Sequence, residues 1–317
     1  MKYVTLSNGI KMPMLGYGVY QTPPSDTRRC VLDAIDVGYR SIDTAQAYGN
    51  EEGVGVALAE SGLPREEFFL TTKVWITNAG YERAKASIEE SMRKLRTDYL
   101  DLLLIHQPFG DYYGTYRAME EFYNAGRLRA IGVSNFGPDR YLDIQHFAAV
   151  KPAVNQIETH VFQQQKTARE YLKKYGCPIE SWVPFAEGRK HMFNNPVLTE
   201  IGRKYGKTAA QTALRFLMQS DVVVIPKSAH RERMRQNFDL FDLPCRQRIW
   251  RPVKHWTAAR ACSSHTMIPK PLSGSCPSCK IEKDSFGNAA LSKESFMCAM
   301  MCFQGRRAAG RDGPHCG

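Results

Sequence analysis

The sequence lacks the long apolar segments that are typical of secreted and membrane proteins. Its first residues contain no apolar run of signal-peptide length, and no stretch approaches the length needed to cross a bilayer. We therefore expect a cytoplasmic protein without membrane contact. With 317 residues, 43% of them hydrophobic, the chain is long enough for one large α/β barrel or two medium domains.

Glycine-rich nucleotide-binding loops are also missing. Residues 53–58 begin like a dinucleotide-binding fingerprint, but they lack its third glycine and lie inside a predicted helix. Residues 16–18 end a predicted strand, yet no helix follows at the right spacing, and no Gly-Lys-Ser/Thr loop occurs. A doubly wound sheet normally carries such a loop after its first strand, so the sequence favours another α/β architecture.

Excess positive charge and most of the cysteines are confined to the C-terminal end. Residues 243–317 carry 12 Lys and Arg against 4 Asp and Glu, whereas residues 1–242 carry 31 against 28. Seven of the nine cysteines also lie after residue 242. The net charge of +11 therefore belongs mainly to this segment, and we expect no nucleic-acid partner.

The first 242 residues contain a regular alternation of short apolar segments and amphipathic stretches. Eight segments rich in β-forming residues are predicted as strands, and amphipathic helices lie between most of them. The predicted strands end near Gly18, Asp43, Lys73, His106, Ser134, Gln156, Trp182 and Lys227. The predicted helices span 26–37, 50–61, 80–96, 113–126, 138–148, 165–175 and 196–219. Eight such units predict a (β/α)8 TIM barrel.

A shorter feature precedes the first strand–helix unit. Residues 3–6 and 10–12 flank Asn8 and Gly9, a pair that suits the type I′ turn of a β-hairpin. We expect this N-terminal β-hairpin to cap the bottom of the barrel.

Four ionisable residues lie at predicted strand ends or in the loop behind one, where α/β barrels carry their catalytic groups. They are Asp43, Tyr48, Lys73 and His106. A nearby cation lowers the pKa of a phenol, which is ordinarily about 10. Lys73 would act in this way on Tyr48, with Asp43 as its counter-ion, and His106 would hydrogen-bond a carbonyl oxygen. The set suits protonation of an oxygen while hydride reaches the adjoining carbon.

Three of these residues also have a structural interpretation, and a metal site is a further alternative. Asp43 could serve as a turn residue, Lys73 as a solvated charge at the barrel rim, and His106 as a polar group before a turn. Asp43 and His106 could also bind a metal, as in barrel hydrolases. However, no His-x-His pair follows the first strand and few strands end in carboxylates, so we expect no metal.

Several segments resemble the aldo-keto reductase family, in its branch of diketogluconate reductases and prostaglandin F synthase-like proteins. The resemblance covers about residues 1–242. It rests on residues 38–45, 48, 50–51, 71–75, 101–108, 126–136 and 225–228. It implies a barrel that reduces aldehydes or ketones to alcohols with NADP(H), with the four residues above as its tetrad and Tyr48 as general acid. A regulatory or structural protein that binds a cofactor on the same barrel is the alternative.

The resemblance also implies two groups of cofactor-binding residues. Ser134, Asn135 and Gln156 match residues that hold the nicotinamide carboxamide. Trp182 stands where the family has an aromatic residue, commonly Tyr, stacked on the nicotinamide ring. The residues matching contacts to the 2′-phosphate and adenine are Lys227, Ser228, Arg233, Gln236 and Asn237. Two cations and a hydroxyl near a helix N-terminus also suit an anion on physical grounds, so we expect NADPH to be preferred to NADH.

The substrate pocket is expected to be apolar and lined by aromatic residues. Tyr20 and Trp75, together with Trp182, would form its wall beside His106. Core packing is the alternative role for Tyr20 and Trp182. The expected partner is a small carbonyl compound, and the protein is expected to be a monomer.

The amphipathic pattern stops after Asp242, where the family continues with a helix and a loop over the substrate pocket. Cys276 and Cys279 have the spacing of half a zinc site, but no second Cys/His pair matches it, so we attribute them to chance. Residues 256–271, translated back into codons and read in a shifted frame, permit a segment similar to the family's ending. We infer that residues 243–317 result from a frameshift near residue 242, and we expect them to be poorly ordered.

Resequencing the DNA that encodes the residues around Asp242 and Leu243 tests this inference. We expect an inserted or deleted base, because correcting it would restore a family-like ending. An intact reading frame that continues to a natural stop codon would refute the frameshift.

Overall fold

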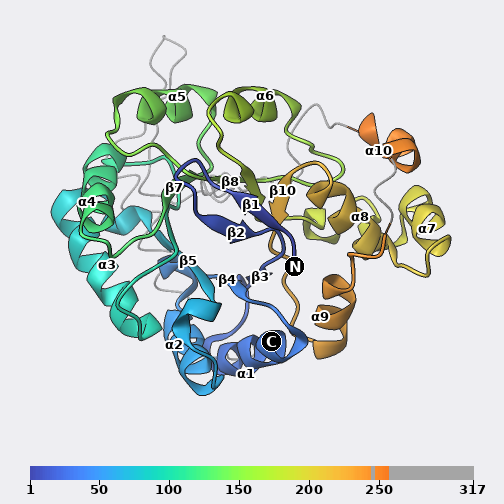
Figure 1. The fold of residues 1–317 in the computed structure, drawn as a ribbon, viewed down its shortest axis with the longest axis horizontal. Coiled ribbons are helices and arrows are strands. Elements are labelled where there is room, and N and C mark those ends of the chain that lie inside the picture. The colour runs from blue at the N-terminus through green and yellow to red at the C-terminus, as the bar shows by residue number, and fades with distance from the viewer. Residues whose placement is uncertain (244–246, 257–317) are drawn as a thin grey trace, which may run out of the picture. The chain divides into compact units, whose positions relative to one another are not determined.

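Eight parallel strands form the centre of the computed structural model, which describes residues 1–243 and 247–256. In chain order they are β3 (Tyr17–Gly18), β4 (Ser41–Asp43), β5 (Phe69–Val74), β6 (Leu102–Ile105), β7 (Ile131–Ser134), β8 (Asn155–Ile157), β9 (Ile179–Ser181) and β10 (Val222–Val224). Each strand pairs with the next one along the chain, and a parallel bridge between Leu15 and Val224 joins the two ends of the sheet. The sheet closes into the predicted (β/α)8 barrel (Figure 1).

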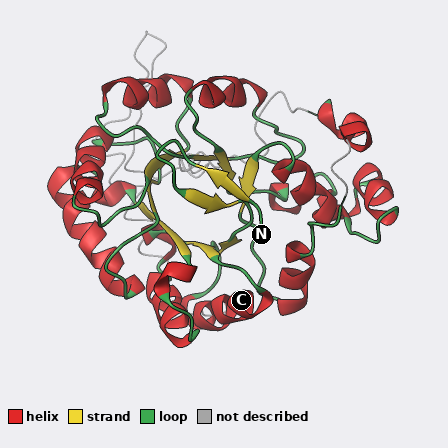
Figure 2. Cartoon of the chain, in the orientation of Figure 1, coloured by secondary structure: helices red, strands yellow, loops and turns green. Residues whose placement is uncertain are grey.

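Helices surround the strands on the outside, as Figure 2 shows in red. They are α1 (Pro24–Val37), α2 (Glu51–Glu60), α3 (Tyr81–Leu95), α4 (Tyr112–Asn124), α5 (Pro138–Phe147), α6 (Lys166–Lys174), α7 (Pro196–Arg203), α8 (Ala209–Met218), α9 (Arg231–Phe238) and α10 (Arg251–Lys254). Short 3-10 turns are η1 (Gln46–Tyr48), η2 (Arg65–Glu67), η3 (Ile76–Asn78), η4 (Ala186–Gly188), η5 (Met192–Asn194) and η6 (Gln247–Trp250). Within the described residues, no helix combines the length and apolar character that a membrane span requires.

The predicted helix over residues 196–219 is in fact two helices, α7 and α8. The chain turns between them at Gly206, whose φ of +66° suits glycine. Thr208 then begins α8 with a capping box, in which its hydroxyl accepts from the Gln211 N–H and the Gln211 side chain accepts from the Thr208 N–H. Apolar spacing alone continues through such a break, so the prediction merged the two helices.

Two further differences concern the last unit of the barrel. The strand predicted to end near Lys227 ends at Val224, and Pro226, which has no N–H, cannot extend the hydrogen-bond ladder. Helix α9 follows it. The sequence predicts a helix N-terminus here but gives no bounds for the helix, since its eight residues carry four charges and little apolar pattern.

The N-terminal hairpin consists of β1 (Tyr3–Thr5) and β2 (Lys11–Pro13), which pair antiparallel. Leu6 and Met12 are buried with Phe69 and Leu102, the first residues of β5 and of β6, so the hairpin closes the bottom of the barrel as predicted. In Figure 1 it lies across the barrel opening.

The predicted type I′ turn of this hairpin is wrong. A type I′ turn needs positive φ at both central residues, but here only Gly9 has one, at +85°. The Leu6 N–H donates to the Ile10 carbonyl at 2.8 Å and the Gly9 N–H to the Leu6 carbonyl at 2.9 Å, which is a three-residue loop with a bulge at the glycine.

Two tryptophans of the segment 247–256 pack onto α8 and onto the loop between β8 and α6. Trp250 is 3% exposed, and its ring lies 5.6 Å from that of Phe216 of α8. Trp256 stacks on Phe162 with 5.5 Å between ring centroids. Cys276, Cys279 and the rest of the segment from residue 257 onward lie outside the described residues, so the frameshift and the expected poor order stay predictions.

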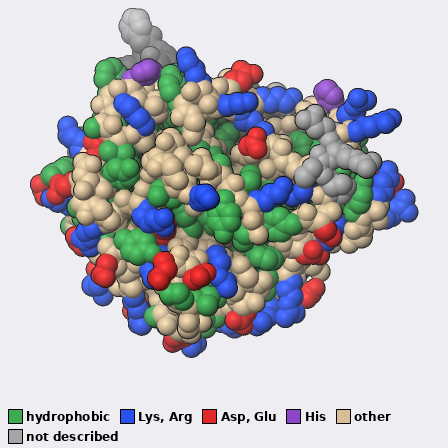
Figure 3. Space-filling view, viewed as in Figure 1, with side chains coloured by type: hydrophobic (Ala, Val, Ile, Leu, Met, Phe, Trp, Pro, Cys, Tyr) green, Lys and Arg blue, Asp and Glu red, His purple; other side chains and the backbone are tan. Residues whose placement is uncertain are grey.

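Charges of both signs are interspersed on the face of the molecule drawn in Figure 3. Lys and Arg side chains alternate there with Asp and Glu, and apolar groups lie between them. This face therefore presents no continuous field of one sign.

Asp101, at the bottom of the barrel, offers a test of the fold. It is 0% exposed and accepts from Arg65 at 2.8 Å, Arg129 at 2.6 Å and the Leu70 N–H at 2.9 Å. Replacing it by Ala leaves these donors unpaired, and we expect a loss of about 3 kcal/mol of unfolding free energy in urea. The control Glu90→Ala removes a solvent-exposed ion pair with Arg93 and should hardly move the urea midpoint. Equal effects of both substitutions would contradict the conclusion that the buried Asp101 stabilises the barrel through its three donors.

Candidate active site

Strand register places one row of polar side chains inside the barrel. Asp43 of β4 pairs with Thr71, and Lys73, two residues further along β5, pairs with Leu104 of β6. Since side chains two residues apart point to the same face, Asp43, Lys73 and His106 share the inner face. The same row continues through Ser134, Gln156 and Glu180 on β7, β8 and β9. The register therefore explains why residues far apart in sequence meet.

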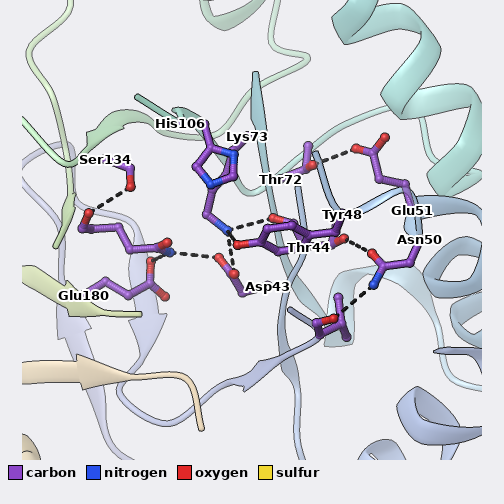
Figure 4. Close-up of polar contacts among 12 residues, drawn as sticks. Asp43, Thr44, Tyr48, Asn50, Glu51, Thr72, Lys73, His106, Ser134 and Glu180 are labelled. Atoms are coloured by element: carbon purple, nitrogen blue, oxygen red, sulfur yellow. Dashed lines mark hydrogen bonds and ion pairs between the residues drawn. The ribbon is translucent and has the colours of Figure 1, made fainter. Parts of the chain in front are cut away.

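Lys73 is the centre of this row. It is 0% exposed, and its Nζ donates to Asp43 Oδ1 at 2.6 Å, to the Thr44 carbonyl at 2.8 Å and to the Tyr48 hydroxyl at 3.4 Å. Figure 4 shows these three contacts converging on the ammonium group. Burial opposes the charge of Lys73, but Asp43 and the Tyr48 hydroxyl outweigh it and raise the pKa of the amine. Lys73 is therefore a buried cation, not a solvated rim charge.

Tyr48 reaches this group from η1, the turn that follows β4. The next residue but one, Asn50, is 1% exposed and ties the turn to the rest of the barrel mouth. Its amide accepts from Thr44 at 2.9 Å and donates to the carbonyls of Val19 at 3.0 Å and Thr22 at 3.2 Å. These bonds fix the turn that carries the phenol above Lys73.

The pKa of Tyr48 differs from the expected direction. Burial raises it to about 12, although Lys73 lowers it as the sequence predicted. The prediction considered only the cation and left out the larger cost of burying a phenolate. As a result, the hydroxyl keeps its proton at neutral pH, which is the form that a proton donor needs.

His106 follows β6 and faces the phenol. Its ring lies 5.6 Å from that of Tyr48 and 5.0 Å from that of Trp75, both in edge-on geometry. Burial, and then the charge of Lys73, lower its pKa well below the ordinary 6.5, so the imidazole is neutral. Its Nδ1 is buried without a hydrogen-bond partner among the described residues. A neutral imidazole still has one N–H to donate.

The four predicted catalytic residues are thus brought together, and two more buried residues adjoin them. Gln156 Nε2 donates to Asp43 Oδ2 at 2.9 Å and to Glu180 Oε2 at 2.8 Å. The sequence reasoning missed Glu180. A carboxyl group in the middle of a short strand between two apolar stretches was the available signal, because parallel barrel strands bury both faces.

The residues predicted to hold a nicotinamide lie next to this group. Asn135 donates to the His106 carbonyl and to Ser134 Oγ, each at 3.2 Å. Its side-chain oxygen accepts from the Trp182 indole N–H at 3.0 Å. Trp182 is half-buried, held in place by this bond. A row of polar side chains and an aromatic ring therefore border the tetrad on the side of β7 to β9.

The second predicted cofactor group lies on β10's exit loop and on α9. Lys227 and Arg233 are exposed, and neither forms an ion pair within the described residues. Ser228 is 7% exposed, and its hydroxyl accepts from the His230 N–H at 3.1 Å. Gln236 is exposed and Asn237 is buried on the same helix. Among the described residues, this region therefore offers two cations without a carboxylate partner near the first turn of α9, and Lys227 Nζ donates only to the Gln21 carbonyl at 3.4 Å.

Of the three predicted substrate residues, His106 belongs to the tetrad, and Tyr20 and Trp75 flank it. The Tyr20 ring lies 5.0 Å from that of Tyr48, and Trp75 adjoins His106 as stated above. Tyr20 is 38% exposed, so it is not a core residue. In the described ranges, no cluster of three His, Cys, Asp or Glu side chains is arranged to hold a metal ion.

Comparison with known proteins gives one consistent result. Residues 12–255 match the sequence profile of the aldo/keto reductase family. The chain is 46% identical over 246 residues to the glyoxal reductase of Bacillus subtilis, covering 77% of this chain and 88% of that protein. It is 40% identical over 242 residues to the methylglyoxal reductase DkgA of Escherichia coli, covering 75% and 87%.

A solved structure agrees with the sequence comparison. The crystal structure of a mutant of Gox0644 in complex with NADPH superposes with a TM-score of 0.78 at 37% identity, covering 82% of this chain and 95% of that one.

Proposed function

Since the chain belongs to the aldo/keto reductase family, whose members are oxidoreductases that act on carbonyl groups, we propose that it reduces a small aldehyde or ketone to an alcohol with NADPH, and that Tyr48 is the general acid. The observation that carries this proposal is the contact of a buried, ion-paired Lys73 with the Tyr48 hydroxyl. The named activities of the similar proteins, on glyoxal and methylglyoxal, support a small dicarbonyl as substrate.

The residues present fit a nicotinamide dinucleotide with a 2′-phosphate. The half-buried ring of Trp182 offers a stacking surface, and the side-chain oxygens of Ser134, Asn135 and Gln156 offer acceptors for the N–H groups of a carboxamide. Lys227 and Arg233, unpaired within the described residues, offer positive charge for a phosphate. When bound, the nicotinamide supplies the hydride.

The residues of this chain supply the proton and the charge stabilisation. Tyr48 donates its proton to the carbonyl oxygen, and the phenolate that results lies against the Lys73 ammonium. Asp43 keeps that ammonium charged in a dry site. The neutral His106 donates its N–H to the same oxygen and so orients the carbonyl group.

The remaining expectations belong to the same proposal. All four tetrad residues come from one chain, so a monomer suffices for the reaction. We further propose that the protein has no nucleic-acid partner, because the charge of residues 1–242 is nearly balanced. A cytoplasmic location stays a proposal that rests on the sequence alone.

Tyr48→Phe tests the general acid. Without the hydroxyl, we expect kcat for aldehyde reduction to fall by about 10²- to 10⁴-fold, while NADPH binding, followed by quenching of Trp fluorescence, stays within about twofold. Tyr81→Phe, which removes a hydroxyl bonded to Glu121 on the outer helices, is the control. Near-normal turnover of Tyr48→Phe would show that another group donates the proton. A wild-type chain that binds NADPH but reduces no carbonyl would instead support the regulatory alternative.

Arg233→Ala tests the phosphate site. Loss of this cation should raise KM for NADPH about tenfold and leave KM for NADH nearly unchanged, because NADH lacks the 2′-phosphate. Arg235→Ala is the matched control, since Arg235 is an exposed arginine of the same helix that pairs with Glu232 at 3.7 Å. If both variants raise KM for NADPH equally, the effect comes from the loss of positive charge in general and not from a specific phosphate site. Equal efficiency of the wild type with both dinucleotides would also contradict the proposal.

A further inference from the structure

Glu180 is a buried acid that the mechanism above does not use. It lies in the middle of β9 and is 1% exposed. Its Oε2 accepts from Gln156 at 2.8 Å, and its Oε1 is buried without a partner among the described residues. In Figure 4 it lies on the far side of Asp43 from Tyr48.

No donor of Lys73 is left for Glu180. An ammonium group has three N–H donors, and those of Lys73 go to Asp43, the Thr44 carbonyl and Tyr48. The strands that flank β9 bring no other cation, because β8 contributes the amides Asn155 and Gln156 and β10 contributes only valines. The charged groups that reach Glu180 are therefore Asp43 from β4 and Lys73 from β5.

The inner face of the barrel thus holds two carboxyl groups and one ammonium. If Glu180 were ionised, it would be a buried charge with only an amide as partner, next to a second negative charge. Burial, and then the charge of Asp43, raise the pKa of Glu180 to about 8. At neutral pH, Glu180 therefore retains its proton in most molecules.

Gln156 connects this neutral acid to the ion pair. The two hydrogens of its Nε2 are divided between Asp43 Oδ2 and Glu180 Oε2. With Oδ2 held in this way, Oδ1 of Asp43 is directed at the Lys73 ammonium, which in turn contacts Tyr48. Glu180 thus acts on the phenol through three intermediaries, Gln156, Asp43 and Lys73, and touches neither the phenol nor the reacting atoms.

We propose that Glu180 is a positioning residue for the reduction: as a neutral acid it anchors Gln156 and Asp43, and its ionisation weakens proton donation by Tyr48. The inference rests on the proposed function. When Glu180 loses its proton, a second negative charge lies near Lys73 and Tyr48. The phenol then holds its proton more firmly, and the reduction slows.

The test compares wild type with Glu180→Gln, which keeps the shape and the hydrogen-bond acceptor but cannot ionise. The first readout is the urea midpoint of the protein without cofactor between pH 5 and pH 9. A carboxyl group with a raised pKa in the folded state stabilises the fold at low pH, and this contribution is lost as the pH rises. We expect the wild-type midpoint to fall relative to that of Glu180→Gln over this range.

The second readout is the pH profile of kcat for NADPH-dependent reduction of methylglyoxal. We expect the wild-type rate to fall about tenfold toward alkaline pH and the Glu180→Gln rate to persist to higher pH. Glu51→Gln is the matched control, because Glu51 is another buried acid with a raised pKa, bonded to Thr72 rather than to the tetrad. It should keep the wild-type pH profile of kcat.

Three results would overturn the proposal. Urea midpoints that run parallel across the pH range would show that Glu180 does not carry the extra proton. Midpoints that diverge beside superimposable pH profiles of kcat would reduce Glu180 to a structural residue and leave the proposed function intact. A wild type that reduces no carbonyl at any pH would end the proposed function, and with it the positioning role, whatever the urea midpoints show.

Discussion

Lys73 and Asp43 form an ion pair almost completely removed from water, with 2.6 Å between the nitrogen and the oxygen. Removing two charges from water is unfavourable unless each finds further partners. Lys73 finds them in the Thr44 carbonyl and the Tyr48 hydroxyl, and Asp43 finds one in Gln156. The ion pair therefore determines where its neighbours lie, because each group that hydrogen-bonds to it must be held in a fixed position.

The same dry environment affects the other ionisable groups in different directions. Burial raises the pKa of Tyr48 and lowers that of His106, so both are neutral hydrogen-bond donors near pH 7. Lys73 is the exception, because Asp43 lies beside it. The neutral phenol of Tyr48, the neutral imidazole of His106 and the fixed ammonium of Lys73 together suit a negative charge that develops on an oxygen atom. No solvent has to rearrange for them to stabilise it.

The fold was largely predictable from the sequence, because the alternation of apolar strands and amphipathic helices, with polar residues at the strand ends, is typical of a barrel. Asp43, Lys73 and His106 were found for this reason, since each lies within one residue of the end of an apolar strand. Breaks that depend on local bonds were less visible. The capping box at Thr208 and the bulge at Gly9 are recognised only from the hydrogen bonds in the structure. Glu180 was missed although a carboxyl group in a short apolar strand was a signal, because its neighbours depend on the register of β9 with β8, which no single segment reveals.

The balance between burial and charge at Tyr48 was also beyond the sequence. A lysine predicted nearby suggests a lowered pKa for Tyr48. The direction of the net pKa shift, however, also depends on how completely the fold removes the phenol from water. The roles of the residues around β10 and α9 stay predictions for a related reason: exposed cations are positioned by the ligand as much as by the fold.

The most direct test of the account is the rate of NADPH oxidation in a single turnover with methylglyoxal. It is measured for the wild type and for the double variant Lys73→Met/Asp43→Asn. The double variant removes both charges together, so it leaves no unpaired buried ion to unfold the barrel. The account predicts a rate at least about 100-fold lower in a folded protein that still binds NADPH. A rate close to that of the wild type would show that the buried ion pair does not govern proton donation by Tyr48.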